Sequence, residues 1–387
     1  MSQALKDSPK WDRVRGIIER NDLDALVVRF TENVLYFTNW WPITGWGVAI
    51  IFRDHAPVVF VPDSEMEWTK FSIVKDLRPY APNGNESVYK QLGQLELAGL
   101  RVGIEESVQS LASSHLCYEV QFPSKPFFEG LRAHFPRTTF IDATPAIYEM
   151  RRVKTAFEIE QLRLVQKMNA YGIAAAYDAC VAGATEMEIQ TTFEKATSDA
   201  IARHADQVMF VRGIAFVMAG PNGAKANYPY NISTAYKMKR GEFSMVEVNS
   251  QVNGYWSDLT RTFVVGHHPT AEQQDMFETI NASIDAACRV MKPGCTTQAA
   301  YQASRAVIAK KPFAKYHAPF LGHGIGVKLH ETPPLISSDS EGALELGNYV
   351  SIEPGLYLPE MGALRIERNA IIREYGGEVL DTALNQL

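Results

Sequence analysis

The chain has 387 residues, of which 46% are hydrophobic and 21% are charged, so it can bury the cores of two ordinary domains. Its net charge of −6 argues against a nucleic-acid partner, because nucleic-acid surfaces are basic. The apolar stretches have only strand length, and the polar N-terminus lacks a signal-peptide core, so neither a membrane span nor secretion is expected. The four cysteines form no CxxC pair and are expected to stay reduced. Together these features predict a cytoplasmic protein.

The first part of the chain alternates short β-rich runs with amphipathic stretches. Strands are expected at 25–28, 48–52, 58–61 and 102–104. This alternation predicts an α/β domain with a mixed or parallel sheet, which we place at residues 1–150.

A second domain is expected over residues 151–387, beginning with a helix from Lys154 to about Val181. Further helices are expected after Thr185 and Thr270, because each threonine is followed three residues later by Glu or Gln, the spacing of a capping box. Strand-like segments follow at 209–218, 245–249, 255–265, 349–353 and 364–372.

These segments carry four acidic residues and one histidine whose chemistry is that of a metal site. The candidates are Glu247, Asp258, His323, Glu353 and Glu367. Carboxylate oxygens hold divalent ions by charge, and one neutral histidine nitrogen favours manganese, cobalt, iron or zinc over calcium. Four carboxylates exceed the need of one ion, so the sequence predicts two ions that share bridging carboxylates and activate a water between them.

Strand alternation supports the same interpretation. Val246 and Val248 would pack beneath one strand while Glu247 faces a cavity, and Ile352 would pack beneath another while Glu353 does the same. A single acidic residue on a strand is usually a solvated edge charge, and only the joint placement of five candidates favours a site.

Two other motifs are excluded. The segment Gly-His-Gly-Ile-Gly at 322–326 lacks the GK[ST] sequence of a phosphate loop. The segment His-Glu-Thr-Pro-Pro at 330–334 is not the helical HExxH motif of zinc proteases, because its prolines oppose a helix.

The segments around these residues resemble those of the creatinase/aminopeptidase P/prolidase family, the M24 metallopeptidases of pita-bread fold. The resemblance covers roughly residues 150–380 and includes Asp258-Leu-Thr-Arg-Thr, Gly322-His-Gly-Ile-Gly, Glu353-Pro-Gly and Arg365-Ile-Glu. It implies an α/β N-terminal domain and an α+β pita-bread catalytic domain. It further implies that Glu353 accepts a proton from the attacking water, and that His330 and Arg365 orient the substrate.

The chain departs from the family at residues that shape the substrate pocket. Two family histidines fall on Asn227 and Pro319, so only His330 remains of three, although His317 lies two residues from Pro319. Because Asn227 cannot exchange a proton near neutral pH, a creatinase mechanism is disfavoured. We expect a metallohydrolase of a C–N bond in a small or dipeptide-like substrate, with a pocket diverged from Xaa-Pro cleavage. The alternatives are a metal-dependent lyase like dimethylsulfoniopropionate lyase and a non-catalytic binding protein.

Three tryptophans lie close together near the N-terminus, at Trp40, Trp41 and Trp46. They either pack inside the protein or form an aromatic wall for the pocket of a partner subunit, as the family resemblance implies for a homodimer. We therefore include Trp41 and Trp46, together with Asn227, His317 and Tyr255, among the expected substrate contacts.

Overall fold

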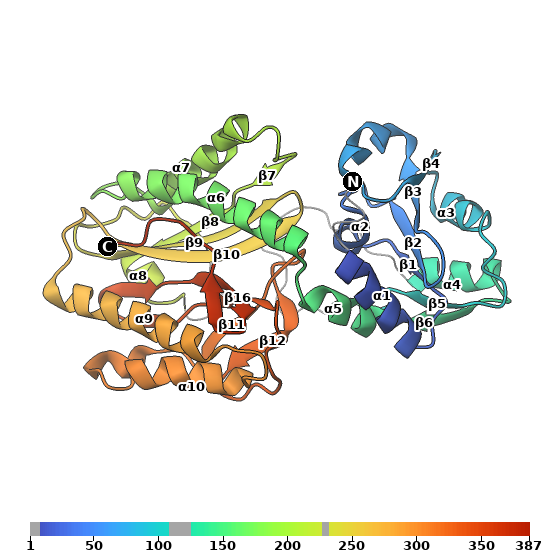
Figure 1. Ribbon diagram of the computed structural model, residues 1–387. Coiled ribbons are helices and arrows are strands. Elements are labelled where there is room, and N and C mark those ends of the chain that lie inside the picture. The colour runs from blue at the N-terminus through green and yellow to red at the C-terminus, as the bar shows by residue number, and fades with distance from the viewer. Residues whose placement is uncertain (1–7, 108–124, 227–231) are drawn as a thin grey trace. The chain divides into compact units, whose positions relative to one another are not determined.

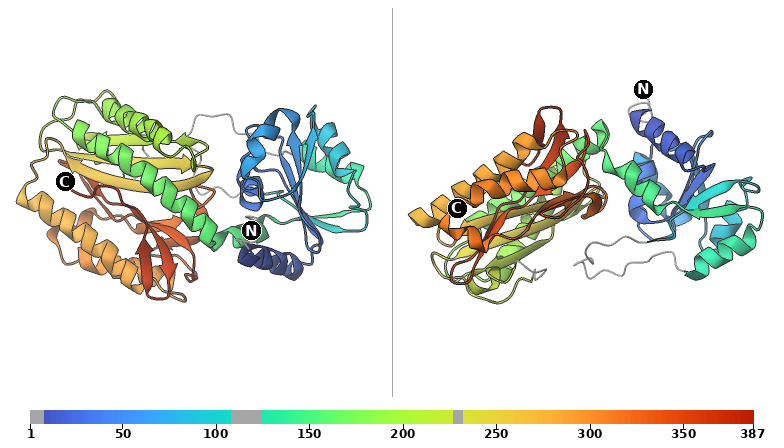
Figure 2. Two further views of the ribbon diagram at one scale, coloured as in Figure 1. Left: turned by 45° about the horizontal axis from the view of Figure 1, so that its top comes forward. Right: turned by 90° about the horizontal axis from the view of Figure 1, so that it is seen from below.

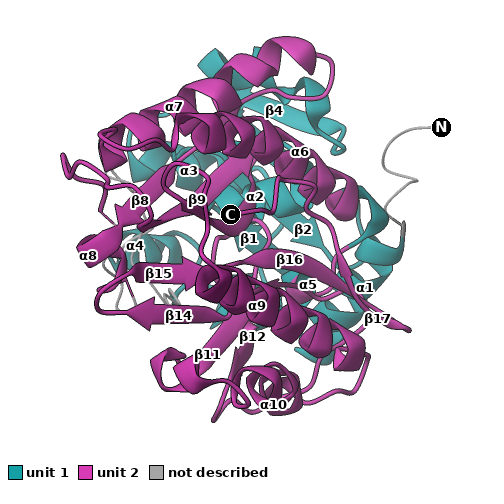
Figure 3. Ribbon diagram, turned by 90° about the vertical axis from the view of Figure 1, so that its left-hand side faces the viewer, with its two compact units in different colours: residues 1–151, 155–157 teal, residues 152–154, 158–387 magenta. Residues whose placement is uncertain are grey.

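The computed structural model describes residues 8–107, 125–226 and 232–387 and divides the chain into two compact units. Unit 1 comprises residues 1–151 and 155–157, and unit 2 comprises residues 152–154 and 158–387 (Figure 3). In the part of the chain that is described, no helix has the length and apolarity needed to cross a membrane.

Unit 1 is built on a six-stranded sheet with the strand order β4-β3-β2-β1-β5-β6. The strands are β1 (Ala25–Val28), β2 (Val48–Phe52), β3 (Val58–Pro62), β4 (Asp76–Tyr80), β5 (Arg101–Ile104) and β6 (Thr139–Asp142). The four strands expected from the sequence are thus confirmed. The sheet is mixed, because β1 pairs antiparallel with β2 and parallel with β5.

Helices cover both faces of this sheet (Figure 1). One face presents Val27, Ile50 and Phe60 to α3 and α4 in a single apolar cluster. The side chains alternate along each strand, so the neighbouring residues face the other side. The helices of unit 1 are α1 (Ser8–Arg20), α2 (Thr31–Thr38), α3 (Asn85–Leu92), α4 (Lys125–His134) and α5 (Thr144–Arg152), with a 3₁₀ segment η2 (Asp63–Phe71).

The tryptophan segment has a different environment at each position. Trp40 is fully buried inside unit 1, and a Cβ on Gly47 would lie 2.8 Å from its ring. Of the two alternatives considered for the tryptophans, packing inside the protein therefore applies to Trp40. Trp46 is half-buried against the apolar cluster of the sheet, and Trp41 is half-buried as well.

Unit 2 contains two larger sheets, each covered by a pair of helices (Figures 1 and 2). Helices α6 (Ala156–Ala179) and α7 (Glu186–Asp199) pack on the sheet formed by β7 (Val211–Arg212), β8 (Ala215–Ala219), β9 (Phe243–Val252) and β10 (Tyr255–Val264). Helices α9 (Ala271–Val290) and α10 (Thr297–Ile308) pack on the sheet formed by β11 (Phe320–Gly324), β12 (Glu331–Ser337), β13 (Tyr349–Ile352), β16 (Arg368–Arg373) and β17 (Gly376–Val379). The remaining elements are β14 (Gly355–Leu358), β15 (Gly362–Arg365), the short α8 (Gly220–Gly223), and the 3₁₀ segments η3 (Ala200–Arg203) and η4 (Pro312–Tyr316).

Local sequence explains how several of these elements start and turn. The capping boxes expected at Thr185 and Thr270 are both present. Asn253 and Gly254 connect β9 to β10 with φ of 51° and 86°, the left-handed geometry that a two-residue hairpin turn requires. This turn sets the register in which Asp258 lies opposite Asn249 and Thr260 opposite Glu247.

Glu105, at the end of β5, holds the start of α2. Its carboxylate accepts hydrogen bonds from the backbone amides of Arg29 (2.5 Å) and Phe30 (3.0 Å) and from Asn33 Nδ2 (2.5 Å). The N-cap residue Phe30 has no side chain that could do this. Burial nevertheless raises the pKa of Glu105 to about 7, against the opposing effect of these hydrogen bonds.

We expect Glu105→Gln to reduce the pH dependence of unit 1 stability. Between the ordinary value of 4.5 and about 7, the folded state binds more protons than the unfolded state, so the free energy of unfolding falls as the pH rises through this window. Glutamine cannot titrate, so the loss between pH 5 and 8 should be smaller by about 2 kcal/mol. Urea unfolding followed by tryptophan fluorescence measures this, since five of the six tryptophans lie in unit 1. Glu129→Gln, which removes an exposed carboxylate of the same unit, is the control, and equal slopes in wild type and Glu105→Gln would contradict the prediction.

Candidate metal site

Unit 2 brings the five expected ligands together from both of its sheets. Glu247 lies on β9, Asp258 on β10 and His323 on β11, whereas Glu353 directly follows β13 and Glu367 lies between β15 and β16. Ligand atoms of Glu247, Asp258 and Glu367 lie within 4.8 Å of one another, as do those of His323, Glu353 and Glu367. We call these five residues the acidic cluster.

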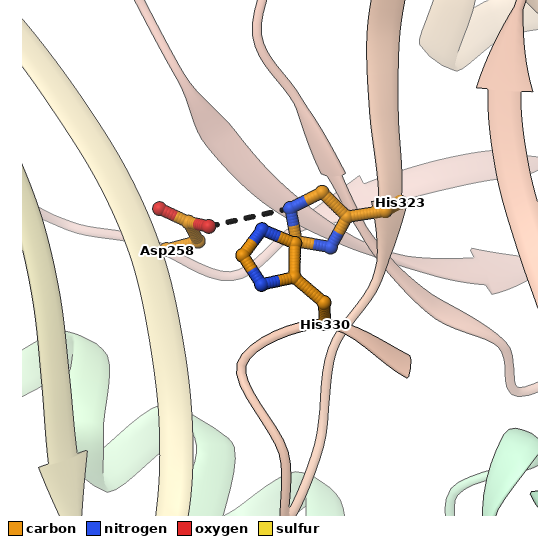
Figure 4. Close-up of side chains that lie close together, drawn as sticks. All are labelled: Asp258, His323 and His330. Carbon is orange, nitrogen blue, oxygen red and sulfur yellow. Dashed lines mark ion pairs between the residues drawn. The ribbon is translucent and has the colours of Figure 1, made fainter. Parts of the chain in front are cut away.

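His323 lies at the centre of this cluster, with its ring beside Asp258 and His330 (Figure 4). Its Nε2 lies 3.3 Å from Asp258 Oδ2 and 3.7 Å from Glu353 Oε1. Its Nδ1 lies 2.9 Å from the carbonyl oxygen of Gly324, which can only accept, so Nδ1 carries a proton. In the neutral ring, Nε2 therefore presents its lone pair to the carboxylates.

Among the described residues, Arg365 is the guanidinium that forms ion pairs with carboxylates of the cluster. It forms an ion pair with Glu247, and its Nη1 lies 3.9 Å from Glu353 Oε2. Its Nε donates to Thr260 Oγ1 over 3.1 Å, and that hydroxyl in turn donates to Glu367 Oε2 over 2.8 Å. Four carboxylates thus face one fixed positive charge.

Burial and mutual repulsion shape the protonation of the cluster. Burial, followed by the charge of Glu367, raises the pKa of Asp258 and of Glu353 well above the ordinary range of a carboxyl group. Burial also raises the pKa of Glu367, although Arg365 acts in the opposite direction. Burial lowers the pKa of His323, which favours the neutral ring that a metal ion binds.

The cluster contains hydrogen-bond acceptors whose lone pairs a divalent cation would bind. Glu367 Oε1 is buried and has no hydrogen-bond donor among the described residues. The lone pair of neutral His323 Nε2 faces Asp258 Oδ2, and two acceptors at 3.3 Å need a cation or a proton between them. The residues present therefore fit a metal site of oxygen ligands with one histidine.

The other expected site residues lie at different distances from the cluster. The His330 ring centroid is 4.2 Å from that of His323, and His330 shares a potential ligand group with Asp258 and His323. His317 Nδ1 donates to the carbonyl of Gly355 over 3.1 Å, and its ring stacks against Tyr301 of α10. Tyr255 is only 2% exposed, and Asn227 lies outside the described residues.

Two polar residues at the cluster were missed by the sequence interpretation. Tyr357 accepts a hydrogen bond of 3.3 Å from Arg365 Nη1, and the hydroxyl of Thr260 contacts Glu247, Glu367 and Arg365. Strand alternation could have indicated Thr260, which lies two residues after Asp258 and faces the same side.

Family models match both units. The model of metallopeptidase family M24 matches residues 160–374, and that of the creatinase/prolidase N-terminal domain matches residues 10–153. The chain belongs to metallopeptidase family M24. This confirms the resemblance and the expected fold class, and membership of a family of metallopeptidases implies a divalent metal cofactor.

Relatives of this M24 chain cover almost its whole length. It is 26% identical to an Xaa-Pro dipeptidase of Pyrococcus furiosus over 98% of this chain and 99% of that protein. The solved prolidase from Pyrococcus horikoshii superposes with a TM-score of 0.77 at 24% identity, covering 98% of this chain and 100% of that one. An Xaa-Pro dipeptidase from Bacillus anthracis gives a TM-score of 0.79 at 21% identity, covering 100% and 99%. These structures share the fold.

We expect His323→Ala to weaken metal binding by more than about 100-fold, because it removes the one neutral nitrogen ligand of the cluster. Isothermal titration of the metal-free protein with Mn²⁺ or Co²⁺ measures the affinity, and metal analysis after gel filtration gives the content. His204→Ala is the matched control, since His204 is also a buried histidine of unit 2 but contacts the Tyr171 hydroxyl at 3.1 Å. Unchanged affinity in His323→Ala would show that the cluster does not hold the metal.

Proposed function

We propose that the protein is a metal-dependent hydrolase that cleaves the C–N bond of an amide in a small or dipeptide-like substrate. The observation that carries this proposal is the acidic cluster, in which three buried carboxylates, the partly buried Glu353 and a histidine lone pair converge with one guanidinium. The relatives named above are peptidases that act on Xaa-Pro dipeptides by their names, which favours hydrolysis over the lyase alternative.

The number of carboxylates supports a pair of ions. Four carboxylates and one histidine nitrogen converge on the cluster, which is more ligands and more negative charge than a single divalent ion needs, even with Arg365 paired to Glu247. We propose that Glu247, Asp258, His323, Glu353 and Glu367 hold two ions of manganese, cobalt, iron or zinc. Such ions, when bound, lower the pKa of a coordinated water and polarise a carbonyl oxygen.

The side chains around the ions would orient the substrate and transfer protons. We propose Glu353 as the acceptor of the proton that leaves the attacking water, the role that the M24 resemblance implies, and its carboxylate lies 3.7 Å from His323 Nε2 at the cluster. His330 and Arg365 would orient the substrate at the rim of the cluster. Asn227, His317, Tyr255, Trp41 and Trp46 stay predictions as further substrate contacts.

We expect slow turnover of ordinary Xaa-Pro dipeptides, because Asn227 and Pro319 take the places of two family histidines. Kinetics with the metal-loaded protein on Xaa-Pro dipeptides, other dipeptides and small amides test this, and chelation should abolish every activity. Asn227→His should raise kcat/KM for Xaa-Pro substrates by about 10-fold, less than the roughly 10²- to 10⁴-fold of a fully positioned general acid or base, because only one of the two histidines is restored. Lys225→His adds an imidazole two positions earlier in the sequence as a control, and efficient Xaa-Pro cleavage by the unaltered chain would contradict the idea of a diverged pocket.

We also expect a homodimer, in which the tryptophan segment of one subunit contributes to the pocket of the other. Trp41→Ala and Trp46→Ala should raise KM several-fold without changing metal content, because they remove aromatic surface from the substrate and leave the ligands intact. Light scattering gives the oligomeric state. Trp68→Ala is the control, since Trp68 is a tryptophan of unit 1 that is 46% exposed. A monomer in solution, or unaltered kinetics in both variants, would contradict this prediction.

A further inference from the structure

β10 is joined to residues 365–369 by a line of contacts that we call the seam. At one end, Thr262 Oγ1 donates to the carbonyl of Arg365 over 2.9 Å and accepts from its amide over 3.0 Å. In the middle, the amide of Glu367 donates to the carbonyl of Thr260 over 3.0 Å. The alternate residues Thr260 and Thr262 of β10 therefore each have a partner across the seam, as in an antiparallel ladder in which some links are side chains.

At the other end of the seam, the side chain of Asn369 forms two hydrogen bonds with the backbone of Asp258. The side-chain Nδ2 of Asn369 donates to the carbonyl of Asp258, and its Oδ1 accepts from the amide of Asp258 over 3.3 Å. One side chain therefore satisfies both backbone groups of a cluster residue on its open side. Asn369 is fully buried, so no solvent could replace these bonds.

The side-chain amide of Asn369 also accepts a hydrogen bond from Gln166 of helix α6. Gln166 Nε2 lies 2.7 Å from Asn369 Oδ1 and 2.9 Å from the hydroxyls of Ser257 and Tyr349. Gln166 is fully buried too, and Tyr349 donates to the same Oδ1 over 3.1 Å. The orientation of the Asn369 side chain is thus fixed by groups from three different elements.

We propose that Asn369, oriented by Gln166, is a positioning residue that sets the place of the Asp258 carboxylate and thereby the metal affinity of the cluster. This inference rests on the proposed function, in which Asp258 is a metal ligand. The physical reason is that Asp258 and Glu367 come from opposite sides of the seam. The spacing of their carboxylates is therefore determined by the hydrogen bonds across the seam, and loss of a residue that orients a metal ligand typically weakens metal binding by about 10- to 100-fold.

The test is the metal affinity of Asn369→Leu and Gln166→Met, two replacements of similar size that lack the hydrogen bonds. Asn369→Leu leaves the backbone of Asp258 unpaired, and we expect its dissociation constants for Mn²⁺ and Co²⁺ to rise by about 10- to 100-fold. Gln166 contacts Asn369 and not Asp258, so Gln166→Met should raise these dissociation constants less, by several-fold. The visible absorption bands of bound Co²⁺ should shift in both variants, because they report the ligand geometry.

Asn348→Leu is the matched control, because it separates positioning from general loss of stability. Asn348 is an equally buried asparagine of unit 2, and it bonds two backbone groups, the Glu345 amide at 2.8 Å and the Arg152 carbonyl at 3.2 Å. We expect it to lower the unfolding midpoint as Asn369→Leu does while its metal affinity stays within about twofold of wild type.

Wild-type affinity and an unshifted Co²⁺ spectrum in Asn369→Leu would overturn the inference and leave the proposed function standing. Equal weakening in Asn348→Leu would overturn it as well. If Asn369→Leu fails to fold, Gln166→Met decides by the same two measurements. A wild-type chain without measurable metal affinity would instead refute the proposed site, and the inference with it.

Discussion

The repulsion among four carboxylates, three buried and one nearly buried, is the constraint on which the centre of unit 2 depends. Glu247, Asp258 and Glu367 are buried and the Glu353 side chain is 11% exposed, while Arg365 pairs with Glu247 and lies 3.9 Å from Glu353 as a fixed positive charge. Without a further cation, burial and the neighbouring charge raise the pKa values of Asp258 and Glu353. The fold keeps these groups together because each lies on, or directly beside, a strand whose other face is anchored in an apolar core.

The two larger sheets of unit 2 supply different residues to the cluster. One sheet supplies two acidic residues from a single hairpin, and the other supplies the histidine and Glu353. Polar side chains that contribute no charge, such as Thr260, Asn249 and Ser351, hold individual carboxylate oxygens in place. Their hydrogen bonds limit the freedom of the carboxylates to move apart, which repulsion would otherwise favour.

Much of the fold could be predicted from the sequence, because it follows from local patterns. The strands of unit 1, the two capping boxes and helix α6 all carry periodicity or cap residues that act within a few positions. Segments that change sheets were less predictable. The strand expected at 364–372 is split into β15 and β16, because the chain passes from a two-stranded to a five-stranded sheet at Ile366 and Glu367. The strand expected at 209–218 also forms two short strands, β7 and β8, but both pair with β9 in one sheet.

The candidate site also combines predictable and unpredictable residues. The acidic residues and the histidine of the cluster could be predicted from residue type and spacing, and their functional roles stay predictions. The residues that orient these side chains could not be predicted from the sequence. Gln166 and Asn369 form a hydrogen bond although they are 203 positions apart in the chain, and no local sequence pattern marks either of them. The position of Arg365 against Glu247 likewise depends on how two distant strands meet.

The supply of ligands from both sheets has a mechanical consequence. An ion held between Asp258 and His323 would be a cross-link between two halves that are otherwise joined at this point by hydrogen bonds and packing. Such a cross-link closes a long loop of chain and removes conformational entropy from any partly opened form. Because such an ion would bind the closed arrangement and not an opened one, metal binding would stabilise the closed arrangement of the two sheets by mass action.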